Sequence, residues 1–100
     1  DGEVLDAIAE RTLADAGAAG TGLPVTALAA LPQAIRLRVI RAWLQAGGAV
    51  RLSSKQILGV DALVTAWRGQ GGVAVGSELS GQRLFAGRRD GVLTMYRQPL

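Results

Sequence analysis

The chain has 100 residues, of which 49% are hydrophobic and 19% charged, which supports one domain with an apolar core and argues against disorder. It has no cysteine and no histidine, which excludes disulfides, thiol nucleophiles, the usual zinc ligands and imidazole acid–base chemistry. The net charge of +3 hides an asymmetry, because residues 1–20 carry −4 whereas residues 21–100 hold ten basic and three acidic residues, a net +7. Such a basic body favours an anionic partner such as nucleic acid, although an ordinary solvated surface explains the charge equally well.

The first 22 residues form a segment of their own. Residues 3–16 are predicted to be helical, since apolar residues recur there at helical spacing and acidic residues crowd the first turns. The run from Gly17 to Gly22 breaks that helix. Because the sequence starts at Asp1 within this pattern, we expect it to be part of a longer protein. The glycine-rich run therefore marks the first boundary in the chain, and we place it after residue 22, so that residues 23–100 form a second unit.

The second predicted helix covers residues 32–46. A proline opens it, where the missing N–H costs nothing, and Gly47-Gly48 ends it. Large apolar residues form one broad face, and Arg38 and Arg41 lie on the opposite face. Arg36 instead projects from the apolar arc, where a charge is costly unless a partner waits for it.

The third predicted helix begins with a capping box, in which Ser53 is the cap and Gln56 stands three residues later. Its apolar residues form a helical stripe that runs to Trp67, and Gly69 ends the helix. We expect Trp67, like Trp43 on the second helix, to pack in the core rather than to stack on a base.

The remainder of the chain changes to the periodicity of strands. Residues 73–75 are a short strand candidate, and residues 82–88 and 92–97 flank Asp90-Gly91, a strong hairpin turn signal. The predicted fold class is therefore α+β, with three helices followed by a small antiparallel sheet, as a hairpin or meander.

The sequence gives little support for catalysis. Only Asp61, Glu78 and Asp90 supply carboxylates after residue 20, and no two of them stand at a spacing suited to acid–base work. The glycine-rich run of residues 69–72 lacks the Lys-Ser/Thr of a phosphate loop and is interpreted as a helix stop. We therefore predict no catalytic residue and no metal site. No apolar run approaches the ~18 residues that span a bilayer, and no signal peptide is visible, so we expect a cytoplasmic protein without membrane contact.

Arginines are the candidate RNA-binding residues, because guanidinium groups suit phosphate and RNA helices are recognised mainly by shape and phosphate contacts. The candidates are Arg36, Arg38, Arg41, Arg83, Arg88 and Arg89. Arg38 and Arg41 could equally be a solvated helix face. Arg36 could instead form a salt bridge with an acid such as Asp61 or with one on the first predicted helix. Arg88 and Arg89 could simply discourage aggregation at a sheet edge.

Three stretches of the sequence stand out together. They are Leu28-Ala-Ala-Leu31-Pro32, then Ala34-Ile-Arg-Leu-Arg-Val-Ile-Arg-Ala-Trp-Leu44 with Gly47, and Gly59-Val-Asp-Ala-Leu-Val-Thr-Ala-Trp-Arg-Gly-Gln-Gly-Gly72. The first two resemble the domain after the catalytic core in bacterial tRNA(Ile)-lysidine synthetases, and the third resembles its actinobacterial form. The tail, with Arg83, Arg88, Asp90-Gly91 and Val92-Leu-Thr-Met95, is similar to that domain's closing sheet. The resemblance covers about residues 23–97. It implies that residues 1–22 are the end of a connecting helix plus a glycine-rich linker and that residues 23–100 are the substrate-binding domain.

The resemblance implies a function. The family's enzyme, a ligase of tRNA processing, uses ATP to adenylate the wobble cytidine of an isoleucine tRNA with anticodon CAU, and lysine then displaces AMP to leave lysidine. The catalytic half carries a Ser-Gly-Gly-X-Asp-Ser loop that is absent here, so the parent is an enzyme but this chain alone is expected to be inactive. It would need no cofactor, since ATP and Mg²⁺ would bind the parent's catalytic domain. Its implied task is to hold the tRNA, with its own N-terminal catalytic domain as a second partner.

Two other functions stay open on the sequence alone. Three helices followed by a hairpin is the element order of a winged-helix DNA-binding module, but the turn over residues 47–52 is longer than the ~3–4 residues typical of such modules. The would-be recognition helix also offers only Lys55 and Arg68 for reading bases. The second alternative is a structural domain that packs on its catalytic half or on a second copy, as a homodimer.

Overall fold

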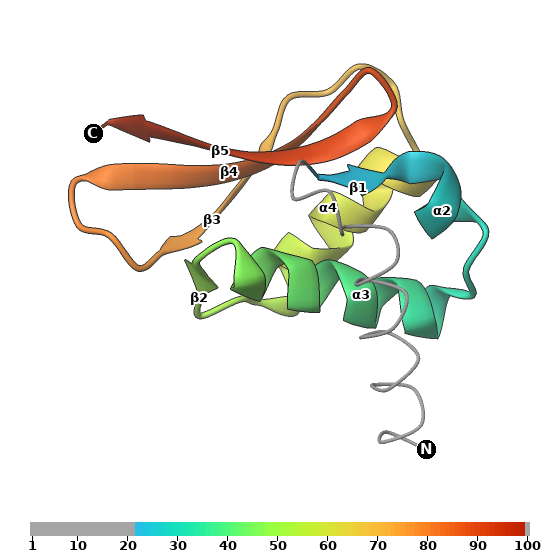
Figure 1. Cartoon of the computed structure of the whole chain (residues 1–100), viewed down its shortest axis with the longest axis horizontal. Helices are drawn as coiled ribbons and strands as arrows, with labels where there is room; N and C mark the ends of the chain where they lie inside the picture. The colour runs from blue at the N-terminus through green and yellow to red at the C-terminus, as the bar shows by residue number, and fades with distance from the viewer. Residues whose placement is uncertain (1–21, 100) are drawn as a thin grey trace.

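The structure is a computed structural model that describes residues 22–99. The predicted helix over residues 3–16 and the linker up to residue 21 lie outside the described residues, so the predicted boundary at residue 22 stays a prediction. The elements are shown in Figure 1. In chain order they are β1 (Leu23–Pro24), α2 (Val25–Ala29), α3 (Gln33–Ala46), β2 (Ala49–Val50), α4 (Ser54–Thr65), β3 (Val73–Ser77), β4 (Gln82–Arg89) and β5 (Val92–Pro99).

The strands form one antiparallel sheet in the order β1-β5-β4-β3-β2. Strands β3, β4 and β5 are a meander, and the two-residue strands β1 and β2 pair with its outer members. The predicted hairpin is confirmed, since Arg89 and Val92 are partners across a two-residue turn at Asp90-Gly91. Both turn residues have positive φ, 54° and 76°, the conformation for which Asp-Gly is well suited.

The helices form a second layer on one face of the sheet (Figure 1). Helix α4 packs against β3 and β4 and also against α3, while α2 packs against α4 and β1. This arrangement confirms the predicted α+β class. The sequence did not predict α2, β1 or β2, because a five-residue helix and two-residue strands are too short to show a period. The order therefore differs from the predicted one, since β1 precedes the described helices and β2 lies between α3 and α4.

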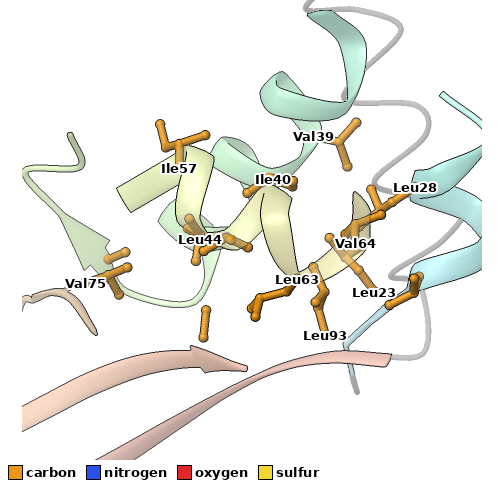
Figure 2. Packing of buried hydrophobic residues seen from close by; sticks show 14 of the residues in the cluster. Leu23, Leu28, Val39, Ile40, Leu44, Ile57, Leu63, Val64, Val75 and Leu93 are labelled. Carbon is orange, nitrogen blue, oxygen red and sulfur yellow. The ribbon is translucent and has the colours of Figure 1, made fainter. Parts of the chain in front are cut away.

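The core lies between the two layers, as Figure 2 shows. Leu28 of α2, Leu44 of α3, Leu63 of α4 and Leu93 of β5 are all completely buried, so every larger element contributes to one cluster. Burying a leucine side chain stabilises the fold by about 1.5–3 kcal/mol before entropy is counted, which is why the apolar stripes of the sequence fix the layer contacts. Trp43 packs partly buried against this cluster, as predicted.

Helix α3 starts one residue later than expected. Pro32 is its N-cap, with extended backbone at ψ 150°, and its carbonyl accepts hydrogen bonds from the N–H groups of Ile35 and Arg36 at 3.1 and 2.9 Å. The predicted end is confirmed, because Gly47 is the C-cap and Gly48 has a φ of 102°. Proline and glycine thus frame the helix that carries Arg36, Arg38 and Arg41.

Helix α4 begins as predicted but ends early. The capping box is confirmed, with Ser53 N–H donating to Gln56 Oε1 at 3.0 Å and Gln56 N–H donating to Ser53 Oγ at 3.1 Å. The backbone leaves the helix at Ala66, with φ −136° and ψ 44°, well before Gly69. Trp67 therefore lies beyond the helix and is 40% exposed, so the prediction that it packs in the core is wrong.

Candidate nucleic-acid interface

Each of the three acidic side chains in the described residues lies beside an arginine. The pairs are Asp61 with Arg36, Glu78 with Arg97 and Asp90 with Arg89. The second joins the loop after β3 to β5 at 2.9 Å, and the third is a 4.0 Å contact between side chains that are 94% and 88% exposed. Residues 21–100 hold ten basic and three acidic residues, and the buried charge pair, Arg36 with Asp61, is neutral overall. The excess positive charge therefore lies at the surface.

Arg36 is held inside the helical layer, where only 8% of it is exposed and only 5% of Asp61. Its Nε donates to Asp61 Oδ1, its Nη2 donates to Asp61 Oδ2 at 3.2 Å, and its Nη1 donates to the carbonyl of Leu31 at 3.0 Å. The Arg36 guanidinium thus joins α3 to α4 and to the α2–α3 loop. This is the salt bridge that the sequence left as the alternative, and it gives the buried guanidinium the partner that its position demanded.

Arg88 also serves the fold. Its Nη1 donates to the carbonyl of Leu63 in the last turn of α4 at 2.9 Å, and its guanidinium carbon lies 5.0 Å from the centroid of the Trp67 ring. A cation at this end complements the negative pole of the helix, and its position over the ring adds a cation–π contact. Arg88 therefore closes the C-terminal end of α4 against the sheet and shields part of Trp67.

The other four candidates lie at the surface on two sides of the molecule. Arg41 is exposed and Arg38 is half-buried on the face of α3 that points away from the core, where Arg38 already has an interaction within the protein. Arg83 and Arg89 are exposed at the two ends of β4, on the face of the sheet opposite the helices. Of the six candidates, Arg38 and Arg41 lie one turn apart on α3, whereas Arg83 and Arg89 lie at opposite ends of β4, so the structure does not gather the six arginines into one patch.

Sequence reasoning missed two groups of surface residues. Arg51 is exposed directly after β2 with a φ of 53°, and no sequence signal marks that conformation for an arginine. Phe85 and Tyr96 face each other across β4 and β5. Counting outward from the Asp90-Gly91 turn predicts that pairing, so the signal for it was present in the sequence.

In the described part of the chain, no group of three or more His, Cys, Asp or Glu residues is placed to bind a metal ion. Among residues 22–99, no helix has both the length and the apolar character needed to cross a membrane.

These features define a small α+β domain with basic surfaces and an interior ion pair. The family model described as the TilS substrate binding domain matches residues 23–92, which is most of the chain. The chain therefore belongs to the TilS substrate-binding domain family, and the resemblance seen in the sequence is confirmed.

Curated relatives named tRNA(Ile)-lysidine synthase match along the whole chain. The protein of Mycolicibacterium paratuberculosis is 68% identical over 100 residues, which is 100% of this chain and 31% of the relative. That of Mycobacterium tuberculosis is 61% identical over 103 residues, covering 100% of this chain and 32% of the relative. That of Nocardia farcinica is 52% identical over 98 residues, covering 98% of this chain and 30% of the relative. The chain thus spans about a third of the length of these relatives.

No solved structure gives a significant match to the chain. The two alternatives left open by the sequence, a winged-helix DNA-binding module and a purely structural domain, find no support in the family match or the relatives. The short strand β2 also lies between α3 and α4, in place of the tight turn of a helix-turn-helix.

Proposed function

We propose that this chain is the tRNA-binding domain of a tRNA(Ile)-lysidine synthetase, a cytoplasmic ATP-dependent ligase that joins lysine to the wobble cytidine of the isoleucine tRNA with anticodon CAU. The observation that carries the proposal is the match to the TilS substrate binding domain over residues 23–92, supported by 68% identity over the whole chain to a relative named tRNA(Ile)-lysidine synthase. The chemistry belongs to the parent's catalytic domain, which would bind ATP and Mg²⁺.

The basic surfaces suit a domain that holds tRNA and does not react with it. RNA helices are bound mainly through their shape and phosphates, which requires cations on a rigid frame and neither an acid nor a base. Arg41, Arg83 and Arg89 present exposed guanidinium groups, and Arg38 stands beside Arg41 on α3. Arg36 is left out of the proposed contacts because its guanidinium is buried and bonded to Asp61 and Leu31.

The proposed partners follow from the same reasoning. The CAU-anticodon isoleucine tRNA is the substrate that the domain would position, and the N-terminal catalytic domain is the body to which it would be joined. A homodimer stays a prediction.

The test is a binding titration against the CAU isoleucine tRNA, an unrelated tRNA and duplex DNA at several salt concentrations. If the four surface arginines contact phosphates, the log–log dependence of affinity on salt should have a slope of about −3 to −4. We expect both tRNAs to bind more tightly than duplex DNA, since the domain recognises the shape of tRNA. Binding that is equal for DNA and tRNA, or that is insensitive to salt, would contradict the proposal.

A further inference from the structure

The outer face of the sheet is formed by alternate residues of β4 and β5. Inward-pointing residues such as Leu84, Ala86 and Leu93 are buried under the helices, so their neighbours in the chain point outward. The helices of the described residues all lie on the inner side (Figure 1). The outward positions hold Arg83, Phe85, Gly87 and Arg89 of β4 and Val92, Thr94, Tyr96 and Gln98 of β5.

Two aromatic side chains meet at the middle of this face. Phe85 and Tyr96 are cross-strand partners, and their rings are stacked with centroids 5.3 Å apart and planes inclined by 12°. Such a pair stabilises the hairpin by up to about 1 kcal/mol. Hairpin stability does not require exposure, yet Tyr96 is 40% exposed and is one of the exposed large hydrophobic residues among those that the structure describes.

Two glycines fix the position of the Tyr96 ring. A Cβ atom at Gly72 would lie 2.3 Å from Tyr96 Oη, and one at Gly87 would lie 3.2 Å from Tyr96 Cε1. The ring therefore rests directly against backbone that carries no side chain, with Phe85 on its flank. An aromatic surface held in this way is ordered before any ligand arrives, so little side-chain entropy is lost on binding.

The charges on this face select the ligand. Arg83 is exposed two residues before Phe85 on the same side of β4, and none of the outward positions of β4 and β5 carries an acid. Arg89 stands four residues from Phe85 at the other end of β4, so Arg83 is the nearer of the two outward cations to the aromatic pair. Aromatic rings next to an arginine suit a ligand that combines a flat base with a phosphate.

We propose that the outer face of the sheet binds an unpaired nucleotide of RNA, with its base stacked on the Phe85–Tyr96 pair and its phosphate held by Arg83. The inference rests on the proposed function and deepens it, because it names a contact with a single-stranded part of the RNA. The bases of a helix are stacked on one another and present no free face to Tyr96, so this contact is separate from the phosphate contacts assigned to α3.

The composition of the chain provides a direct probe. Tyr96 is the one tyrosine in the sequence, so protein labelled with 3-fluorotyrosine gives a single ¹⁹F resonance from this position. We expect a single-stranded RNA octanucleotide to shift this resonance in a saturable manner. A blunt RNA duplex of the same length should leave it in place at concentrations that occupy the protein. An unchanged resonance with bound single-stranded RNA overturns the inference.

Two substitutions at one position separate stacking from other effects. Tyr96→Leu removes the ring, and because stacking contributes about 1–3 kcal/mol per base, affinity for the octanucleotide should fall about 5- to 150-fold. Tyr96→Phe keeps the ring and should bind within about twofold of the original protein. Circular dichroism verifies the fold of both variants.

If Tyr96→Leu does not fold, Arg83→Gln at an exposed position provides the second test, with an expected loss in octanucleotide affinity of about three- to tenfold from one phosphate contact. Octanucleotide affinity unchanged in every folded variant overturns the inference.

The outcomes also distinguish this inference from the proposed function. Salt-sensitive tRNA binding with an unmoved Tyr96 resonance would overturn the stacking contact and leave the tRNA-binding proposal in place. Failure of every RNA to bind would overturn both. A resonance that moves when a catalytic domain is added, but not with RNA, would make this face a protein contact and overturn the inference.

Discussion

Arg36 in the helical layer and Arg83 on the outer face of the sheet carry the same chemical group in opposite surroundings. Arg36 is 8% exposed, and each of its donor nitrogens points to an oxygen of the protein. Arg83 is exposed, and its neighbours on that face are Gln98 and the aromatic pair, none of which is acidic. The number of arginines in a sequence is therefore a poor guide to RNA affinity, because burial and intramolecular partners decide which guanidinium groups can reach a phosphate.

The largest expected effect comes from breaking the interior pair on its acidic side. Asp61→Asn keeps the shape of the side chain but leaves Arg36 charged and buried without a counter-charge, so the free energy of unfolding should fall by about 3–5 kcal/mol. Urea unfolding followed by circular dichroism measures the change. Asp90→Asn is the matched control, because the Asp90 side chain is 94% exposed and asparagine tolerates its positive φ. Loss of less than 1 kcal/mol in Asp61→Asn would show that the pair does not hold the helical layer.

An intermediate effect on stability is expected at Arg88, which links the sheet to the C-terminal end of α4. Arg88→Leu removes the hydrogen bond to Leu63 and the contact with the Trp67 ring, and should lower the free energy of unfolding by about 1–2 kcal/mol. The neighbouring Arg89→Leu should change it by no more than about 0.5 kcal/mol, because its side chain is 88% exposed. Tryptophan fluorescence should also change in the Arg88 variant and not in its neighbour. Equal free energies of unfolding for the two variants would show that the Arg88 contacts do not stabilise the fold.

The smallest effect on stability is expected at Arg41, where the substitution should instead change RNA binding. Arg41→Gln removes one exposed cation from α3, so the free energy of unfolding should stay within about 0.5 kcal/mol. The slope of log affinity against log salt for tRNA should become less negative by about 0.7–0.9, the value of one phosphate contact. Filter binding at four salt concentrations measures the slope. A slope equal to that of the original protein would exclude Arg41 from the interface.

Local rules predicted the parts of the fold that depend on neighbours in the chain. The Ser53–Gln56 capping box and the Asp90-Gly91 turn form as expected, because each is complete within four residues. The end of α4 was misplaced since nothing in its apolar stripe shows that the backbone departs at Ala66. Elements as short as α2 exist through their contacts with the rest of the fold, and pattern reasoning has no access to those contacts.

The site was harder to predict for the same reason. The position of Arg36 on the apolar arc predicted that it needed a partner, but its carboxylate lies 25 residues away on another helix. Whether that partner is protein or RNA depends on the packing of α3 on α4. Conversely, Phe85 and Tyr96 could have been paired from the hairpin register, yet two isolated aromatics in a chain with 4% aromatic residues gave no compositional signal.

The measurement that tests the comparison most directly is tRNA binding by the double variant Arg36→Met/Asp61→Leu. Replacing a buried ion pair with apolar side chains of similar volume often preserves or raises stability, so the domain should stay folded by circular dichroism. If Arg36 serves only the interior, tRNA affinity and its salt slope should match those of the original protein. A folded double variant with lost tRNA affinity, or with a slope reduced by about one unit, would show that Arg36 reaches the RNA and would contradict the account.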